Sequence, residues 1–351
     1  MTHINRRQFL TIFASTLGAT TLSSCMPNGG MGGSMLEPSS GLDPAKLTPV
    51  AEIPAVTVSS NTASSFNPDV EIVLRSFVDD YIFSDGDQTN MLRYAGELLT
   101  GQPENLTPMA DSYLGPTIRL KKGQKVRIHL QNQLPFPTIA HWHGQHLPEE
   151  MDGHPLYSIE SGETYVYEFE VNNRAGTYWY HPHPHGHTGA QVYFGLAGLF
   201  IIEDEEEQAY DLPRGEFDVP VVIQDRTFKD DGELQYIDNG HQVMAGFWAN
   251  SLMINGRRDF LQKVSTQPYR IRLLNGSNAR IYKLAWDDDT PVTVIGTDGG
   301  LLGAPVTREY VMLAPAERLE LWVDFAGLDN GSKKSILALP FTGGNESVIE
   351  L

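Results

Sequence analysis

Cysteine is almost missing from this 351-residue sequence, which contains only Cys25. A single cysteine excludes an intrachain disulfide and any metal cage built from several thiolates. Basic side chains are also few, 25 against 44 acidic ones, and the formal net charge is −19. A nucleic acid is therefore not expected as a partner, because phosphate binding needs a basic face. No run approaches the roughly 20 apolar residues that a membrane-spanning helix needs.

Turn-forming residues, in contrast, are plentiful, with 33 glycines and 22 prolines. From Asp69 onward, short apolar runs alternate with clusters of Gly, Pro, Asn and Asp, and residues 126–130 alternate apolar with polar side chains. No segment shows a long apolar stripe of helical period with caps at both ends. The sequence therefore predicts an all-β protein of sandwiches or barrels. Runs of strand length include Val70–Phe77, Gln124–Leu130, Thr164–Val171, Leu196–Ile202, Val219–Ile223, Tyr269–Leu274, Thr293–Gly296 and Arg318–Phe325.

The length predicts two domains of ordinary size. An acidic run at residues 203–207 lies near the middle of the strand-rich body. Five acidic side chains in a row are expected to be solvated, so we interpret this run as a linker between domains. The predicted domains are residues 65–207 and residues 208–351.

The N-terminus has the features of an export signal. Arg6 and Arg7 precede a short apolar run that ends at Leu22, which is typical of a secretory signal peptide. The paired arginines resemble a twin-arginine signal, and Leu22–Cys25 resembles the box at which bacterial lipoproteins are cut and acylated; an ordinary cleaved signal is the alternative. We expect a signal peptide over residues 1–24, a flexible tether over residues 25–64 and a location in the periplasm or cell envelope. A lipid on Cys25 would be the only membrane attachment.

Histidines carry the strongest functional pattern. Eight of the eleven lie between residues 141 and 187, and all of these except His154 fall in two groups that contain aromatic residues, 141–146 and 178–187. A His-X-His pair on an extended segment places both imidazoles on one face. The pairs His141/His143 and His181/His183 would bring four nitrogen donors to one pocket, a donor set that suits copper, zinc or iron and binds copper most tightly. The prolines of the second group predict an edge strand or a strand end there.

These two groups also carry a family resemblance. The segments 141–144 (His-Trp-His-Gly) and 176–183 (Gly-Thr-Tyr-Trp-Tyr-His-Pro-His) resemble the first two copper motifs of the multicopper oxidases. Residues 185–199 are similar to the bacterial laccase and cuprous oxidase branch. The resemblance covers roughly residues 65–345 and implies two consecutive cupredoxin-like Greek-key domains of sandwich or barrel type. Its other segments are Tyr113–Ile118, Ile254–Gly256, Arg272–Arg280, Gly296–Leu302 and Ala314–Arg318.

The resemblance implies a role for five residues. His141 matches a type 2 copper ligand, and His143, His181 and His183 match type 3 copper ligands. Asp152, within Met-Asp-Gly, matches an acidic residue that delivers protons to the oxygen-reducing cluster; a plain turn is the alternative interpretation. Candidates for the outer shell of the site are His146, His154, His185 and His187.

The sequence also departs from the family pattern. A complete family member carries a His-Cys-His motif and a further His-X-His group in a third cupredoxin domain, and that cysteine binds type 1 copper. This sequence has no cysteine after Cys25 and one histidine, His241, after His187, and it ends at Leu351 near where a third domain would begin. We therefore expect half of the trinuclear copper site, no type 1 copper and no turnover by this chain alone. The second domain, without a ligand set, is expected to be a spacer.

Several functions stay open from the sequence. The family oxidises phenols, aromatic amines or metal ions such as Cu(I) by one electron at a time and reduces O₂ to water. This chain could be the truncated part of such an enzyme, or one half of a split enzyme whose partner chain brings His-Cys-His. A non-catalytic copper-binding or scaffold protein of the cell envelope is the alternative, although relatives without oxidase activity tend to lose the copper histidines. A mononuclear zinc hydrolase is a minor further alternative.

Overall fold

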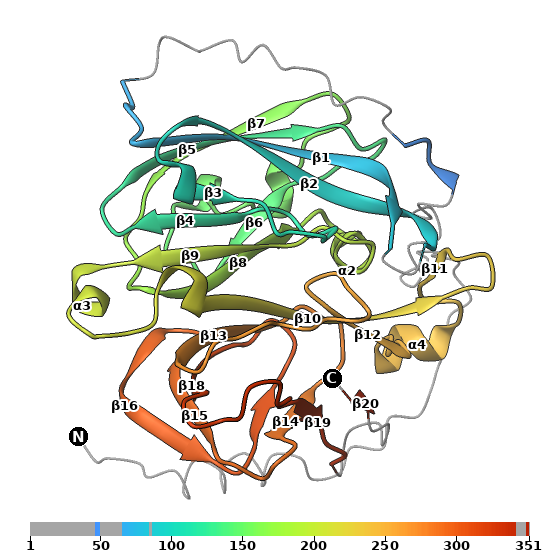
Figure 1. Cartoon of the computed structure of the whole chain (residues 1–351). Coiled ribbons are helices and arrows are strands. Elements are labelled where there is room, and N and C mark those ends of the chain that lie inside the picture. Colours follow the sequence, from blue (N-terminus) through green and yellow to red (C-terminus); the bar gives the residue numbers. More distant parts are fainter. Residues whose placement is uncertain (1–45, 50–64, 84–85, 342–348, 351) are drawn as a thin grey trace, which may run out of the picture. The chain divides into compact units, whose positions relative to one another are not determined.

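The computed structural model describes residues 46–49, 65–83, 86–341 and 349–350 (Figure 1). The predicted signal peptide lies outside these residues, and so does the predicted tether apart from residues 46–49. Within the described ranges, no helix has both the length and the apolar character needed to cross a membrane. Strands dominate the described chain and its helices are short, as the sequence predicted.

The strands before residue 204 form two sheets around one core. One sheet has the order β2-β1-β5-β7 and the other the order β3-β4-β9-β8-β6. Val126, Ile128 and Leu130 are fully buried, so the predicted alternation of residues 126–130 points its apolar side chains into this core. The strands are β1 (Val70–Ile82), β2 (Gln88–Thr100), β3 (Leu106–Thr107), β4 (Thr117–Lys121), β5 (Lys125–Asn132), β6 (Ala140–His143), β7 (Thr164–Glu170), β8 (Gly176–Pro182) and β9 (Gly198–Glu203).

The remaining strands form a second pair of sheets with a core of its own. One sheet has the order β11-β10-β13-β18-β15-β16, with β12 also paired to β10, and the other has the order β17-β14-β19-β20. The strands are β10 (Asp218–Phe228), β11 (Leu234–Gln235), β12 (Ser251–Ile254), β13 (Pro268–Asn275), β14 (Tyr282–Trp286), β15 (Val292–Thr297), β16 (Gly300–Arg308), β17 (Val311–Leu313), β18 (Arg318–Asp324), β19 (Ile336–Ala338) and β20 (Ile349–Glu350). The α-helices of the described residues are α2 (Thr188–Tyr193), α3 (Glu205–Gln208) and α4 (Gly240–Ala245), and the short 3₁₀ helices there are Pro103–Asn105, Glu149–Met151, Pro155–Tyr157 and Gly215–Phe217.

Each of the eight named runs matches a strand, extending beyond it by no more than two residues, which confirms the all-β prediction. The domain boundary at residues 207/208 stays a prediction.

The two sandwiches pack closely against each other. The core of the first sandwich includes Val222, Met253 and Leu274 from the second. Gly256 has a φ of +76°, and a Cβ atom at this position would lie 2.7 Å from the Ser112 hydroxyl oxygen. Glycine therefore permits both the left-handed backbone and the close approach between the sandwiches.

The acidic run at residues 203–207 is only partly solvated: Glu205 and Glu206 are exposed, but Glu207 is buried, against the prediction of five solvated side chains. Asp204 caps helix α3, since its side chain accepts a hydrogen bond from the Glu207 backbone. Glu207 is only 1% exposed and forms an ion pair with the buried Arg270. The prediction failed for Glu207 because it considered only the charges within this segment. A basic partner far away in the sequence, Arg270, offsets the cost of burying the Glu207 carboxylate.

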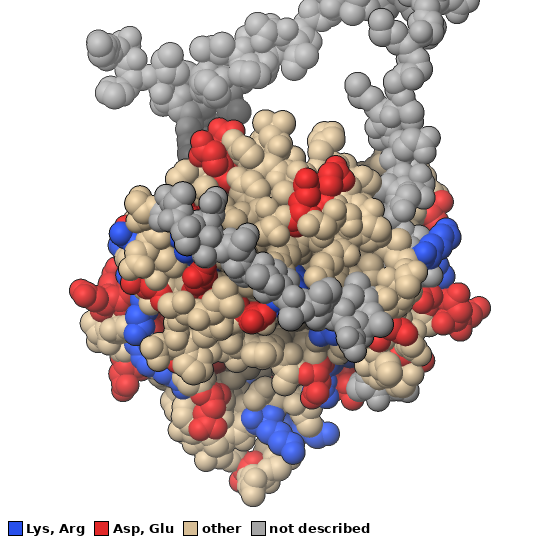
Figure 2. Space-filling model, turned by 90° about the horizontal axis from the view of Figure 1, so that it is seen from above, with Lys and Arg blue, Asp and Glu red and all other residues tan. Residues whose placement is uncertain are grey.

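Charges of both signs are interspersed on the face that Figure 2 shows. In the sheet β2-β1-β5-β7, Arg127 on β5 contacts Glu71 on β1 at 3.4 Å and Glu168 on β7 at 2.7 Å. The buried His129, two residues along β5, lies with Nε2 2.8 Å from a Glu71 carboxylate oxygen. Cross-strand pairs of this kind support the sheet and give His129 a structural role away from the other histidine groups.

Candidate metal centre

Strands β6 and β8 bring the two histidine pairs together. They run antiparallel as neighbours, with His141 directly opposite His181. Strand β6 occupies the edge of its sheet and β8 lies between β6 and β9. The prediction of an edge strand for the second group is therefore wrong, whereas the alternative of a strand end is right because β8 ends at Pro182. Proline has no backbone N–H group, and a strand end tolerates its absence because the ladder of hydrogen bonds stops there.

The four imidazole rings form one cluster. The ring centroid of His141 lies 5.6 Å from that of His143, 5.2 Å from that of His181 and 5.3 Å from that of His183. One ring nitrogen from each of His141, His143 and His181 lies within 4.8 Å of the other two. His183 adjoins this set of three, with its ring 6.0 Å from that of His181. The structure thus gathers the rings that the sequence pattern placed on one face.

Backbone carbonyls determine which nitrogen two of these rings present. Nδ1 of His141 lies 2.7 Å from the Asp152 carbonyl oxygen, and Nδ1 of His181 lies 2.9 Å from the Pro182 carbonyl oxygen. A carbonyl oxygen only accepts hydrogen bonds, so each Nδ1 carries the proton and each Nε2 keeps a free lone pair. A metal ion binds to that lone pair.

The third ring faces one of these lone pairs. Nδ1 of His143 lies 3.2 Å from Nε2 of His181. In the metal-free chain His143 can donate a proton across this gap. The 3.2 Å gap is also close to the separation of two nitrogens that bind the same metal ion, each at about 2.0–2.1 Å from it.

Burial keeps these imidazoles neutral. Desolvation lowers the pKa of His143 to about 4, and the nearby positive charge of Arg318 acts in the same direction. Desolvation also lowers the pKa of His141, and it lowers the pKa of His181 well below its usual range. A histidine must be neutral to bind a metal, so the lowered pKa values of His141, His143 and His181 favour the metal-binding form of these three rings at neutral pH.

Asp152 lies beside this cluster in a tight turn. Its carboxylate is 38% exposed, and one carboxylate oxygen lies 3.5 Å from Nδ1 of His141. Gly153 follows with a φ of +78°, and a Cβ there would lie 2.0 Å from the Ala140 carbonyl oxygen. The turn therefore rests on strand β6, and glycine is what allows its backbone to come so close. Asp152 therefore belongs to a turn and also contacts His141, so both interpretations of its sequence context describe this residue.

Comparisons with known proteins find relatives of this chain. Residues 94–207 match the family described as multicopper oxidase. Multicopper oxidase mco of Staphylococcus haemolyticus is 38% identical over 224 residues, which cover 64% of this chain and 49% of that protein. The solved structure of the McoA multicopper oxidase from Aquifex aeolicus superposes with a TM-score of 0.70 at 38% identity, covering 81% of this chain and 61% of that chain. This chain belongs to the multicopper oxidase family.

The likeness to the Aquifex structure also shows that the fold is cupredoxin-like. A differently named relative is cell division protein FtsP of Xenorhabdus nematophila, 38% identical over 222 residues, which cover 63% of this chain and 46% of that protein. The chain spans about half the length of these curated relatives.

The residues of this multicopper oxidase family member fit a copper ion. The donors are neutral imidazole nitrogens, and two of them, on His143 and His181, face each other across 3.2 Å. Nδ1 of His183 is buried and has no hydrogen-bond partner among the described residues. Imidazole is a favoured ligand of copper, and the carbonyls that hold His141 and His181 are outer-shell contacts of the kind that orient metal ligands.

Three contributors to the site were not predicted. The Asp152 carbonyl, rather than its carboxylate, holds His141 at hydrogen-bond distance. The ring of Trp179 lies 4.3 Å from that of His181 and 5.3 Å from that of His143. Arg318 comes from the second sandwich. Only Trp179 left a signal in the sequence, because strand alternation places it on the same face as His181.

The histidines predicted for the outer shell lie in different settings. His146, His154 and His185 are exposed. Nδ1 of His154 accepts a hydrogen bond from the Leu156 backbone and so caps a short 3₁₀ turn. His187 is half-buried, and its Nδ1 has no hydrogen-bond partner within the described part of the chain. His154 thus has a local structural task, whichever other role it takes.

Proposed function

We propose that this chain is the copper-binding part of a multicopper-oxidase-type oxidoreductase. His141 would be a type 2 copper ligand, and His143, His181 and His183 would be type 3 copper ligands. The observation that carries the proposal is the convergence of neutral imidazole donors from the paired strands β6 and β8. Three histidines lie on two paired strands and His183 directly follows the second strand, a clustering of imidazoles that a structural role for one histidine does not require.

Bound copper would supply one-electron redox chemistry that couples oxidation of a small phenolic, aromatic or metal-ion donor to reduction of O₂ to water. The chain's own residues would hold the site for this chemistry. The carbonyls of Asp152 and Pro182 keep the Nδ1 protons of His141 and His181 in place, which leaves their Nε2 atoms for the metal. We assign the Asp152 carboxylate, which reaches solvent and lies 3.5 Å from the His141 ring, to proton delivery.

The proposed activity needs ligands from outside these 351 residues. The only cysteine is Cys25, and one histidine follows His187, so residues 26–351 supply neither a thiolate for type 1 copper nor a second set of histidines. We propose that a His-Cys-His segment, in the rest of the same protein or in a partner chain, completes the centre. O₂ and the reducing substrate would bind to that completed form.

We also propose that the protein works in the periplasm or cell envelope after export by its twin-arginine signal. Residues 1–24 and the acylation box at Cys25 lie outside the described residues, so the support comes from the order of charged, apolar and small residues. A lipid on Cys25 would tie the chain to the membrane.

One observation favours a second candidate function. The likeness to cell division protein FtsP is as high as that to the oxidase, at 38% identity. A non-catalytic scaffold of the envelope is therefore the alternative. Copper binding separates the two candidates, since a scaffold has no need of the metal.

Copper loading of the whole chain tests the proposed function. We expect wild-type protein, dialysed after incubation with Cu(II), to retain at least one copper per chain when measured by mass spectrometry of the metal. The double variant His141→Ala/His181→Ala should bind copper about 100-fold more weakly, because it loses two of the converging donors.

The matched control is His241→Ala, which removes an exposed histidine of helix α4. It should load like wild type. Wild-type protein without copper, or a double variant that keeps its copper, would contradict the proposal and leave the scaffold as the better account.

A further inference from the structure

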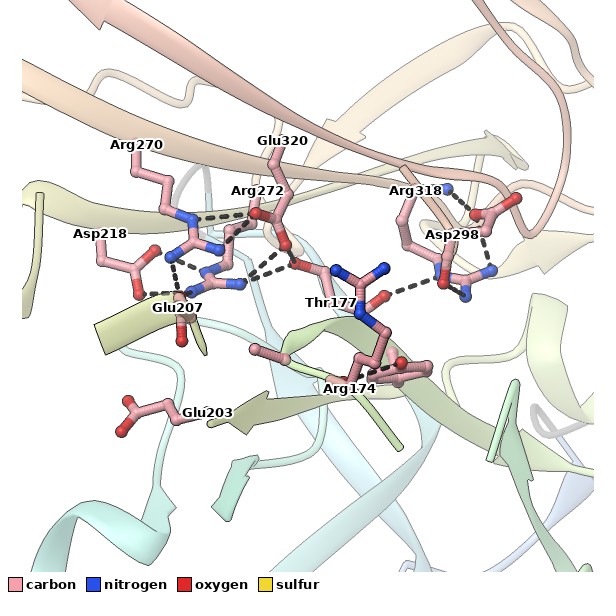
Figure 3. Close-up of polar contacts among 12 residues, drawn as sticks. Arg174, Thr177, Glu203, Glu207, Asp218, Arg270, Arg272, Asp298, Arg318 and Glu320 are labelled. Atoms are coloured by element: carbon pink, nitrogen blue, oxygen red, sulfur yellow. Dashed lines mark hydrogen bonds and ion pairs between the residues drawn. The ribbon is translucent and has the colours of Figure 1, made fainter. Parts of the chain in front are cut away.

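Buried charges gather where the second sandwich meets strand β8 (Figure 3). Arg270 and Arg272 on β13 and Glu320 on β18 are at most 1% exposed. Nε of Arg270 donates to one Glu320 carboxylate oxygen and Nη1 of Arg272 donates to the other, both at 2.9 Å. Asp218 and Glu207 accept from the same two arginines. Every charge in this group has an opposite partner, as burial requires.

Thr177 connects this group to the first sandwich. Its side chain is fully buried. The hydroxyl donates to Glu320 at 2.7 Å and lies 3.1 Å from Nη1 of Arg272, from which it accepts. A carboxylate only accepts and a guanidinium only donates, so the threonine hydroxyl has one orientation. The Thr177 carbonyl in turn accepts from Nε of Arg318 at 2.9 Å.

The backbone beside Thr177 is held as well. A Cβ at Gly176 would lie 3.0 Å from the Gly300 Cα, and a Cβ at Gly300 would lie 2.3 Å from the Ala175 carbonyl oxygen. Strand β16 of the second sandwich therefore rests directly on the first residues of β8. This close approach requires glycine at both positions.

Strand β8 leads from this anchor to the metal centre. All seven of its residues are buried. Side chains alternate along a strand, so Thr177, Trp179 and His181 share a face. His181 lies four positions after Thr177 along the strand, a span of about 13 Å. The Trp179 ring fills the space between, with its centroid 4.3 Å from that of His181.

We propose that Thr177 is a positioning residue for the metal centre. Through its hydroxyl, the buried charges of the second sandwich fix the start of β8 and thereby the placement of His181 and His183. The second sandwich is then more than the spacer that the sequence suggested. The consequence for metal binding rests on the proposed copper function; the anchoring of β8 does not.

Three substitutions test this role in the whole chain. Thr177→Val removes the hydroxyl and keeps the branched shape, whereas Thr177→Ser keeps the hydroxyl. Thr89→Val is the matched control: Thr89 is also fully buried, and its hydroxyl donates at 2.7 Å to the Gly232 carbonyl of the second sandwich, but it lies on β2 in the other sheet. If Thr177→Val does not fold, Thr177→Ala replaces it.

Two measurements are made on each variant. The Kd for Cu(II) is measured by competition with a chelator, and backbone hydrogen exchange of residues 178–183 is measured on the metal-free protein. We expect Thr177→Val to raise the Kd about tenfold, as outer-shell changes do, and to speed exchange in this peptide. Thr177→Ser and Thr89→Val should stay close to wild type in both measurements.

The outcomes separate this inference from the proposed function. If wild type binds copper and Thr177→Val changes neither the Kd nor the exchange, the inference is wrong and the proposed function stands. Equal effects from Thr177→Ser or from Thr89→Val would also overturn it, since the hydroxyl or its location would then be irrelevant. If no protein binds copper but Thr177→Val alone speeds exchange, Thr177 anchors β8 and the proposed copper function fails.

Discussion

Three histidines of the candidate centre, His141, His143 and His181, owe their metal-binding form to their surroundings. The rings of His141 and His181 are oriented by backbone carbonyls, those of Asp152 and Pro182. Burial, together with the charge of Arg318, lowers the pKa of His143 to about 4. Such contacts commonly decide how well a metal is held. The turn at Asp152 is therefore as important to His141 as the histidine's own position on β6.

Substitution of Gly153 tests that turn. Gly153→Ala would place a Cβ 2.0 Å from the Ala140 carbonyl oxygen, so the turn must move and carry the Asp152 carbonyl away from His141. We expect copper affinity, measured by chelator competition, to fall about tenfold.

Gly162→Ala is the control for backbone strain. Gly162 has a similar φ of +84°, but a Cβ there meets nothing within 4 Å. This variant should lose about 1 kcal/mol of stability from the left-handed backbone and keep its copper affinity. Equal losses of copper affinity in both variants would show that the turn at Asp152 has no special role.

For single residues, the sequence predicted which histidines belong to the candidate centre but not which contacts hold them. The spacing His-X-His was enough to predict that His141 and His143 share a face, because alternation along a strand is a local property. The carbonyl that holds His141 belongs to the backbone of Asp152, and no residue type at that position reveals where a carbonyl points. The glycine at 153 was a signal for a turn but not for its contact with β6.

Among the elements, helix α3 shows how strongly a partner changes the meaning of a segment. Glu206 and Glu207 are consecutive in the acidic run. Glu206 pairs with Arg174 at the surface, with side chains 59% and 50% exposed, whereas Glu207 and its partner Arg270 are each 1% exposed. The first pair is screened by water, and the second is not.

The two glutamates should therefore differ in their effect on stability. We expect Glu207→Gln to lower the free energy of unfolding by about 3 kcal/mol, because it removes one partner of a buried ion pair. Glu206→Gln should change it by less than about 1 kcal/mol. Urea unfolding of both variants measures the difference. Two small and equal effects would support the solvated linker that the sequence indicated.

The strands were easier to predict than their neighbours. Each named run matches a strand and extends beyond it by no more than two residues, since apolar residues of strand length bounded by turn residues are a local pattern. The 13-residue strand β2 was not among those runs, although it pairs with β1 along nearly its whole length. Its burial is irregular towards its end, so the pairing with β1 identifies it better than its own periodicity does.

For the whole molecule, contacts between the sandwiches were beyond the reach of the sequence. Thr177 and Glu320 are 143 residues apart, and nothing local to either residue points to the other. The family resemblance did predict two cupredoxin-like domains and the location of the histidines, because its motifs span most of the body. The chain covers about half the length of the curated relatives that it matches.

Pulsed electron paramagnetic resonance of the Cu(II)-loaded chain tests the central claim most directly, because it detects the remote nitrogens of coordinated imidazoles. The account predicts a spectrum with modulation from at least two imidazole ligands, and the loss of that modulation in His141→Ala/His181→Ala but not in His241→Ala. A copper signal without imidazole modulation, or one that persists unchanged in the double variant, would show that the four clustered histidines do not hold the metal.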